Sequence, residues 1–116
     1  MNTSAQDWLA SRAAPAGMLA CGLRRPDGEY LCHSREAGCP VENMKTILHQ
    51  FETSHAALAS EGLAPHWWTW SFAQGEMRFV LRPDGWLLGL VAQFDSEAMH
   101  QLDPLSLEFR SLKLRD

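Results

Sequence analysis

Cysteine is scarce in this chain, and its three cysteines, Cys21, Cys32 and Cys39, include no Cys-x-x-Cys pair. An odd number of cysteines without that spacing indicates neither a disulfide framework nor a structural zinc site, so we expect reduced thiols. Cys39 would be a nucleophile only if His33 approached it and a nearby positive charge lowered the pKa of its thiol. The sequence places no cationic cluster there, which favours a free thiol on a loop.

Motifs for catalysis and phosphate binding are also absent. None of GxGxxG, GxxxxGK[ST] and GxSxG occurs, so phosphate cradles and nucleophile elbows have no basis in the sequence. The histidines do not form HxH or HExxH spacings, and they fall on different expected elements. They are His33, His49, His55, His66 and His100. We therefore predict a protein that is not an enzyme and needs no metal or cofactor.

Positive charge is in the minority, with 10 Lys and Arg against 14 Asp and Glu and a formal net charge of −4. The basic residues form no stripe, which argues against a nucleic-acid surface. No apolar run approaches the length of a membrane span, and the first seven residues lack the pattern of a secretory signal. We expect a cytoplasmic protein that binds other proteins rather than nucleic acid or membrane.

What the chain does contain fits one small domain over residues 1–116. Its 46% hydrophobic and 21% charged residues are typical of a folded globular protein of this length. Ser4 can cap a short helix over about 4–13, and a hairpin follows with strands at 18–23 and 29–33. Its Arg-Pro-Asp-Gly turn at 25–28 predicts a register in which Gly22 faces Cys32. Cys21 then points to the other side of the sheet, which disfavours a Cys21–Cys32 disulfide.

The second half begins with a long helix at 41–61 and continues with three strands at 66–72, 77–81 and 86–92. Asp95 or Ser96 can cap a final helix, which we expect Pro104 to interrupt. The order is helix, two strands, long helix, three strands, helix. It predicts an α+β fold with a single antiparallel five-stranded sheet.

The long helix has two contrasting sides. Apolar residues recur at three- and four-residue steps and predict a core-facing stripe: Val41, Met44, Ile47, Leu48, Phe51, His55 and Leu58. The reverse side is mostly small, which would let another helix approach closely: Thr46, His49, Thr53, Ala56, Ala57 and Ser60.

The run His66-Trp67-Trp68-Thr69-Trp70-Ser71-Phe72 holds three of the five tryptophans. As a strand it places Trp68, Trp70 and Phe72 on one face and Trp67, Thr69 and Ser71 on the other. Apolar surface on both faces needs cover on both, and a second copy of the chain is one source of it. Clustered aromatics can also hold cationic groups or nucleobases, but the strand period favours core plus interface.

Two segments carry a resemblance to a known family. GMLACGLRRPDG at 17–28 and FVLRPDGWLLGLV at 79–91 resemble an apolar strand ending in a charged Asp-Gly turn and a pair of late strands in the Roadblock family of dynein light-chain-type domains. The resemblance covers nearly the full chain and implies a Roadblock/profilin-like fold. It also implies a homodimer in which the central helices pack together and the third strands pair edge to edge.

Members of that family are non-catalytic platforms; some bind small Ras-like GTPases, and a bacterial relative stimulates GTP hydrolysis by its partner. The resemblance thus predicts a homodimeric scaffold or regulator, with a small GTPase or another regulatory protein as partner. The expected dimer interface comprises Thr46, His49, Thr53, Ala56, Ser60, Trp67, Trp68, Thr69, Trp70 and Ser71. The rival hypothesis is a PAS-type sensor of a small molecule, although PAS domains use several short helices where this chain has one long helix.

Overall fold

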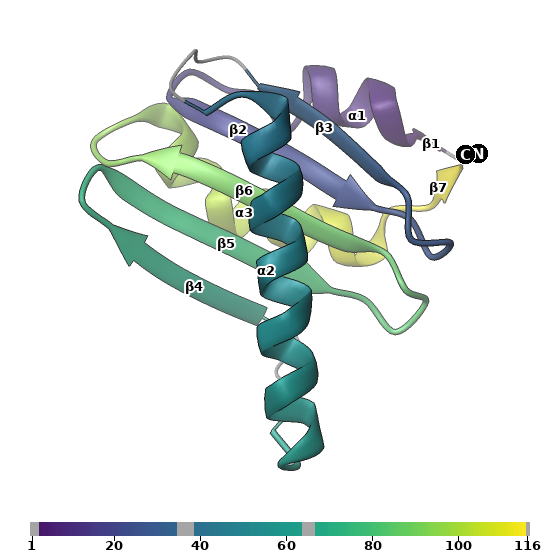
Figure 1. Ribbon diagram of the computed structural model, residues 1–116. Helices are drawn as coiled ribbons and strands as arrows, with labels where there is room; N and C mark the ends of the chain where they lie inside the picture. Colours follow the sequence, from purple (N-terminus) through teal and green to yellow (C-terminus); the bar gives the residue numbers. More distant parts are fainter. Residues whose placement is uncertain (1–2, 35–38, 64–66, 116) are drawn as a thin grey trace.

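The computed structural model describes residues 3–34, 39–63 and 67–115. A five-stranded antiparallel sheet has helix α2 on one face and helices α1 and α3 on the other (Figure 1). The helices are α1 (Ala5–Ser11), α2 (Val41–Ser60) and α3 (Glu97–Ser111). The sheet contains β2 (Met18–Arg24), β3 (Tyr30–Ser34), β4 (Trp67–Phe72), β5 (Gly75–Leu81) and β6 (Leu87–Gln93), in the spatial order β3-β2-β6-β5-β4.

This architecture confirms the predicted α+β class and the order of the main elements. Outside the sheet, β1 (Thr3–Ser4) and β7 (Leu114–Arg115) form a short parallel pair that the sequence did not predict. Ser4 caps α1 as expected, because its hydroxyl accepts a hydrogen bond from the Asp7 backbone N–H at 3.4 Å. His66, placed at the start of the tryptophan strand, lies outside the described residues. None of the helices in the described ranges is both long and apolar enough to cross a bilayer.

The first hairpin has the predicted register. Gly22 lies opposite Cys32, and the Arg25 backbone N–H bonds to the Glu29 carbonyl at 2.8 Å. Cys21 belongs to the core beneath α1 and α3, whereas Cys32 packs against the core beneath α2, so the sheet separates the two thiols. Burial raises the pKa of Cys21 to about 12 and that of Cys32 to about 11, which keeps both thiols protonated at neutral pH.

Helix α2 lies close against the sheet over two glycines. Gly22 on β2 and Gly89 on β6 are cross-strand partners, and both lie beneath Leu48 and Met44. A Cβ atom on Gly89 would stand 2.7 Å from Leu48 Cδ2 and 2.7 Å from Met44 Cε. The bare backbone of this pair therefore sets how deeply α2 packs onto the sheet.

We expect Gly89→Ala to lower the free energy of unfolding by about 1–3 kcal/mol, because two fully buried side chains must shift to admit the methyl group. Urea unfolding monitored by tryptophan fluorescence measures the loss. Gly28→Ala is the comparison, since a Cβ there meets nothing within 4 Å and only the φ of +96° is unfavourable. A Gly89→Ala variant as stable as the parent would contradict this account of the packing.

Pro104 does not interrupt the last helix, so the prediction of a break was wrong. Helix α3 runs through Pro104 without ending. Proline removes the N–H that would bond to the carbonyl of residue 100, but Pro104 and His100 are both on the exposed side, where water can satisfy that carbonyl. The opposite side buries Leu102, Leu105 and Phe109 completely or nearly so, and this packing holds both halves of the helix in line.

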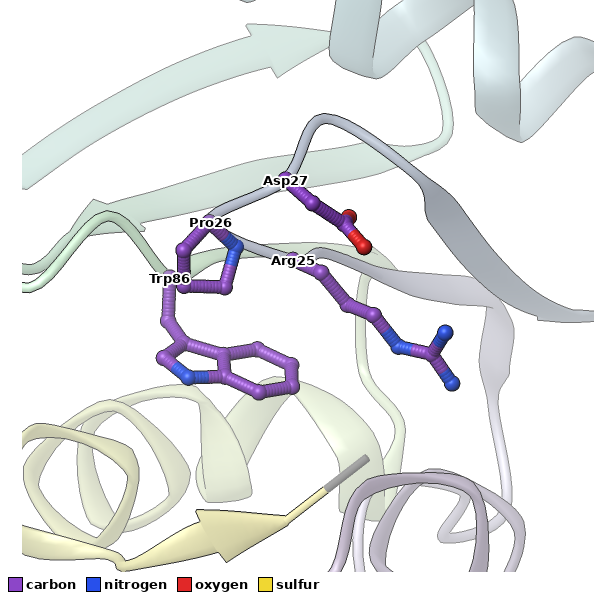
Figure 2. Close-up of a pocket in the computed structure, with 4 residues that line it drawn as sticks. All are labelled: Arg25, Pro26, Asp27 and Trp86. Carbon is purple, nitrogen blue, oxygen red and sulfur yellow. The ribbon is translucent and has the colours of Figure 1, made fainter.

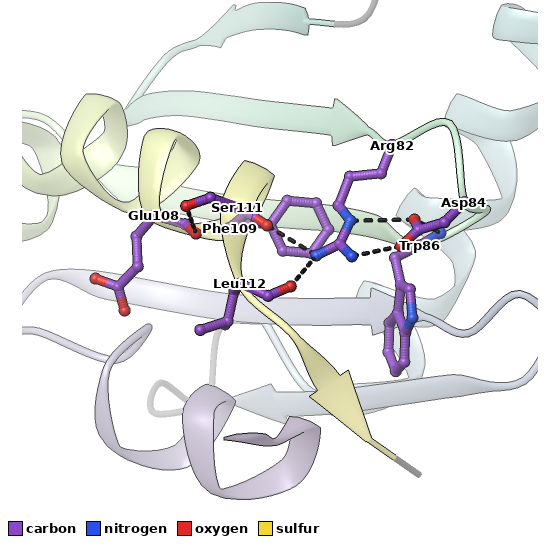
Figure 3. A network of polar contacts seen from close by, with 7 residues as sticks. All are labelled: Arg82, Asp84, Trp86, Glu108, Phe109, Ser111 and Leu112. Carbon is purple, nitrogen blue, oxygen red and sulfur yellow. Dashed lines mark hydrogen bonds and ion pairs between the residues drawn. The ribbon is translucent and has the colours of Figure 1, made fainter. Parts of the chain in front are cut away.

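The C-terminal end of α3 is fixed by Arg82, from the second Arg-Pro-Asp-Gly turn (Figure 3). Its Nη1 donates to the carbonyls of Phe109 at 2.9 Å and Leu112 at 2.6 Å, while its other nitrogens bind the Asp84 carboxylate. The guanidinium also lies 5.1 Å from the centre of the Phe109 ring. Arg82 thus satisfies carbonyls that the end of a helix leaves unpaired, which explains why this turn carries an arginine.

Helix α1 is joined to α3 through Glu108, whose carboxylate accepts hydrogen bonds from the Trp8 indole at 2.7 Å and the Arg12 guanidinium at 2.6 Å. The hydrogen bond from Arg12, with a smaller contribution from Trp8, lowers the pKa of Glu108 below its ordinary value. A carboxylate with a lowered folded-state pKa stabilises the fold above its unfolded pKa and loses that contribution as the pH falls.

The stability difference between the parent and Glu108→Gln should therefore shrink as the pH is lowered from about 6 to about 3. The effect should stay below about 1 kcal/mol, because the Arg12 side chain is 54% exposed and water screens the pair. Thermal unfolding at a series of pH values measures it. A difference that grows towards acid pH would contradict the assigned ion pair.

Candidate interaction surface

Strand β4 forms one edge of the sheet. It pairs with β5 from Trp67 opposite Val80 to Phe72 opposite Gly75, and within the described part of the chain its other side has no strand neighbour. An edge strand presents unpaired N–H and C=O groups to any further strand. The tryptophan-rich segment singled out in the sequence is thus positioned for edge-to-edge pairing.

The face of β4 towards α2 carries an aromatic cluster. The Phe51 ring stacks on Phe79 at 4.6 Å between ring centres and meets Trp68 edge-on at 5.0 Å. Trp70 adds edge contacts with Trp68 at 5.6 Å and Phe79 at 5.3 Å. Trp68 and Trp70 remain only half-buried, whereas Phe51 and Phe79 are fully buried. The prediction that Trp68, Trp70 and Phe72 share one face is confirmed. Trp68 and Trp70 form the part of the cluster that solvent still reaches.

The opposite face of β4 is covered by an arginine. The Arg78 guanidinium lies 4.5 Å from the centre of the Trp67 ring, and its Nε donates to Thr69 Oγ1 at 2.8 Å. Its Nη1 reaches Asp103 at 2.8 Å and Ser106 at 3.4 Å on α3, and the residue is only 8% exposed. Sequence reasoning missed Arg78. The available signal was an arginine in the predicted strand 77–81, whose other residues are all apolar.

The outer side of α2 carries the five helix residues of the predicted interface. Thr46, His49, Thr53, Ala56 and Ser60 are all exposed, opposite the buried Met44, Leu48 and Phe51. The hydroxyls of Thr46, Thr53 and Ser60 donate to backbone carbonyls of their own helix, at 3.1, 3.2 and 2.7 Å respectively. Close approach of another helix would leave these hydroxyls satisfied, so it carries little desolvation cost.

A groove of about 440 Å³ lies along one flank of α2. It runs between the N-terminal half of the helix and the ends of the neighbouring strands. Its lining is largely apolar and comprises Leu19, Cys39, Asn43, Ile47, Phe72, Gln74, Met77, Val91 and Gln93. The helix pattern had assigned Ile47 wholly to the core, so this flank was missed. Burial raises the pKa of Cys39, which further disfavours a nucleophilic role.

A second hollow, of about 490 Å³, lies beside the first Arg-Pro-Asp-Gly turn. Figure 2 shows Pro26 above the Trp86 indole, with Arg25 and Asp27 extending from the turn. The two Arg-Pro-Asp-Gly turns meet here, since a Cβ on Gly85 would stand 3.2 Å from Pro26 Cβ. The turn accounts for Pro26 and for Asp27, whose Oδ1 accepts a hydrogen bond from the Glu29 N–H at 3.0 Å, and Arg25 pairs with Glu29, so this hollow supplies no argument for a ligand.

No protein-family model matches the sequence, and no curated protein matches it significantly. Among solved structures, MglB from Myxococcus xanthus matches with a TM-score of 0.55 and 11% sequence identity, over 82% of this chain and 85% of that chain. MglB is a roadblock-domain protein. The fold is roadblock-like. The roadblock-like fold confirms the architecture that the sequence resemblance implied, and at this identity the likeness concerns the fold alone.

Proposed function

We propose that this protein is a non-catalytic homodimeric scaffold that recruits a regulatory protein, with a small Ras-like GTPase as the first candidate. The observation that carries the proposal is that β4, rich in half-buried tryptophan, forms a sheet edge without a strand neighbour among the described residues. The roadblock-like fold supports it, because the family resemblance implies dimers that serve as platforms for such GTPases.

The proposed interface combines the β4 edge with helix α2. Strand pairing brings together the backbones of residues 67–71, and the exposed helix side contributes Thr46, His49, Thr53, Ala56 and Ser60. Burying roughly 400 Å² of apolar surface would contribute on the order of 10 kcal/mol before association costs. Association costs about 4–15 kcal/mol, so a stable dimer needs the helix contacts as well as the β4 edge.

The sensor hypothesis finds less support. Helix α2 is a single helix of 20 residues, whereas a PAS-type sensor has several short helices at this place. The space between α2 and the sheet is filled by Leu48, Phe51 and Phe79, all fully buried. A haem or flavin beneath α2 would have to displace these side chains.

Light scattering on a sizing column, over a range of concentrations, tests the dimer. We expect a mass of about 26 kDa, twice the 13.0 kDa of the chain, that persists on dilution. A mass of 13.0 kDa at every concentration would overturn the proposal. The second step measures GTP hydrolysis by purified small Ras-like GTPases with and without the dimer, together with their co-elution. Neither binding nor a changed rate would remove the GTPase as partner and leave the dimer standing.

A further inference from the structure

Helix α2 is longer than the sheet that it covers. Figure 1 shows the helix crossing the sheet and its last turns extending past β4. Along the core-facing stripe, Met44, Leu48 and Phe51 are buried by the chain's own sheet, but Leu58, on the same stripe, is only half-buried. The part of this apolar stripe that lies beyond the last strand is therefore not covered by the chain's own sheet.

The end of α2 is held in a defined shape. Gly62 adopts a φ of +80°, its N–H bonds to the Ala59 carbonyl at 3.0 Å, and the Leu63 N–H bonds to the Leu58 carbonyl at 2.9 Å. This is a Schellman motif, in which the side chains of the two residues corresponding to Leu58 and Leu63 usually lie together. Leu63 is 60% exposed. We call Leu58–Leu63 the helix tip.

The groove described above lies on the same face of the sheet but at the other end of α2. Ile47 forms its helix wall, and Phe72 and Met77 form part of its floor. Phe72 is the last residue of β4, while Trp68, which touches Phe51 and His55 of α2, is near the start of that strand. The start of β4 therefore lies beneath the helix where it leaves the sheet, and the end of β4 lies beneath the groove.

Antiparallel pairing of two β4 edges about a two-fold axis places the start of one strand opposite the end of the other. The helix tip then extends across the joined edges towards Phe72 and Met77 of the second copy. We infer that the helix tip of each copy occupies the groove of the other copy, with Leu58 and Leu63 against the wall formed by Ile47. The inference rests on the proposed dimer and names the residues that complete it.

The first test is a disulfide between copies. Residues 43 and 63 of one chain are separated by about 30 Å along the helix axis, so a bond between cysteines at these positions must join two chains. We expect Asn43→Cys/Leu63→Cys to form a cross-linked dimer on mild oxidation, identified by mass spectrometry of the linked peptides. Lys45→Cys/Leu63→Cys is the matched control, since Lys45 lies at a similar height on the other flank and outside the groove; both variants also carry Cys39→Ser, because Cys39 lines the groove.

The second test uses two leucines of equal exposure. Leu63 and Leu107 are each 60% exposed, so a charge at either position should leave the folded monomer intact. We expect Leu63→Asp to raise the dissociation constant of the dimer at least tenfold and Leu107→Asp, on α3, to change it less than twofold. Sedimentation equilibrium measures both constants, and circular dichroism checks that both variants fold.

Three outcomes are distinguishable. The specific cross-link together with weakening by Leu63→Asp supports the inference. A stable dimer that lacks the 43–63 cross-link and tolerates Leu63→Asp overturns the inference and leaves the proposed function intact. A parent protein that is monomeric at all concentrations overturns both.

Discussion

Replacing Phe51 by alanine should lower the free energy of unfolding by about 3–5 kcal/mol, the largest stability loss we expect from a single truncation. Phe51 is 1% exposed and contacts the rings of Phe79, Trp68 and Trp70 at once. Its removal leaves a cavity at the point where α2, β4 and β5 meet, and the neighbouring rigid rings cannot collapse to fill it. Chemical denaturation at a fixed protein concentration measures the loss.

Phe94→Ala is the matched control, because Phe94 is 41% exposed and belongs to neither core cluster. Its cost should stay within about 0.5 kcal/mol. Similar losses for the two variants would mean that the aromatic cluster does not dominate the packing of α2. A lowered stability of Phe51→Ala accompanied by a quenched or shifted tryptophan fluorescence would locate the change at Trp68 and Trp70.

Trp70→Glu should convert the dimer into a monomer, with at least a 100-fold increase in its dissociation constant. Trp70 is half-buried in one copy, and pairing of β4 edges would place a carboxylate in each chain beside the same two-fold axis. Desolvation of two like charges opposes association, and the free edge of β4 then remains in water. Light scattering gives the mass, and circular dichroism reports whether the monomer is folded.

Ser71→Lys is the second variant, for the case in which Trp70→Glu aggregates. Ser71 is exposed on β4, so a lysine there spares the monomer core while blocking the edge, as lysines do on natural edge strands. We expect a folded monomer. A Ser71→Lys protein that remains a dimer of parental affinity would exclude β4 pairing as the mode of association.

The elements that sequence reasoning predicted correctly are those with strong local signals. The apolar stripe of α2 repeats over five turns, and the turn at Pro26 and Gly28 fixes the register of the first hairpin through local backbone geometry. The alternation in β4 likewise assigned Trp68 and Trp70 to the face towards α2. In each case residues close in sequence determine the outcome.

What sequence reasoning missed depends on contacts between distant residues. Pro104 stays within α3 because Leu102, Leu105 and Phe109 are buried against the sheet. Arg78 is held over Trp67 by hydrogen bonds to Thr69 of β4 and to Asp103 and Ser106 of α3. The groove beside Ile47 is lined by residues of α2 and of four strands, from Leu19 to Gln93, a grouping that no local pattern contains.

The pairing of β1 with β7 places both ends of the chain on one side of the molecule. Thr3 lies opposite Leu114, so the two ends of the chain emerge together, at the side of the molecule away from β4 (Figure 1). A fluorophore, affinity tag or surface tether attached at either end will therefore stand clear of the tryptophan strand. In a dimer joined at β4, labels at the chain ends would lie at the two outer ends of the assembly. The distance between two such labels, measured by spectroscopy, would therefore report on assembly.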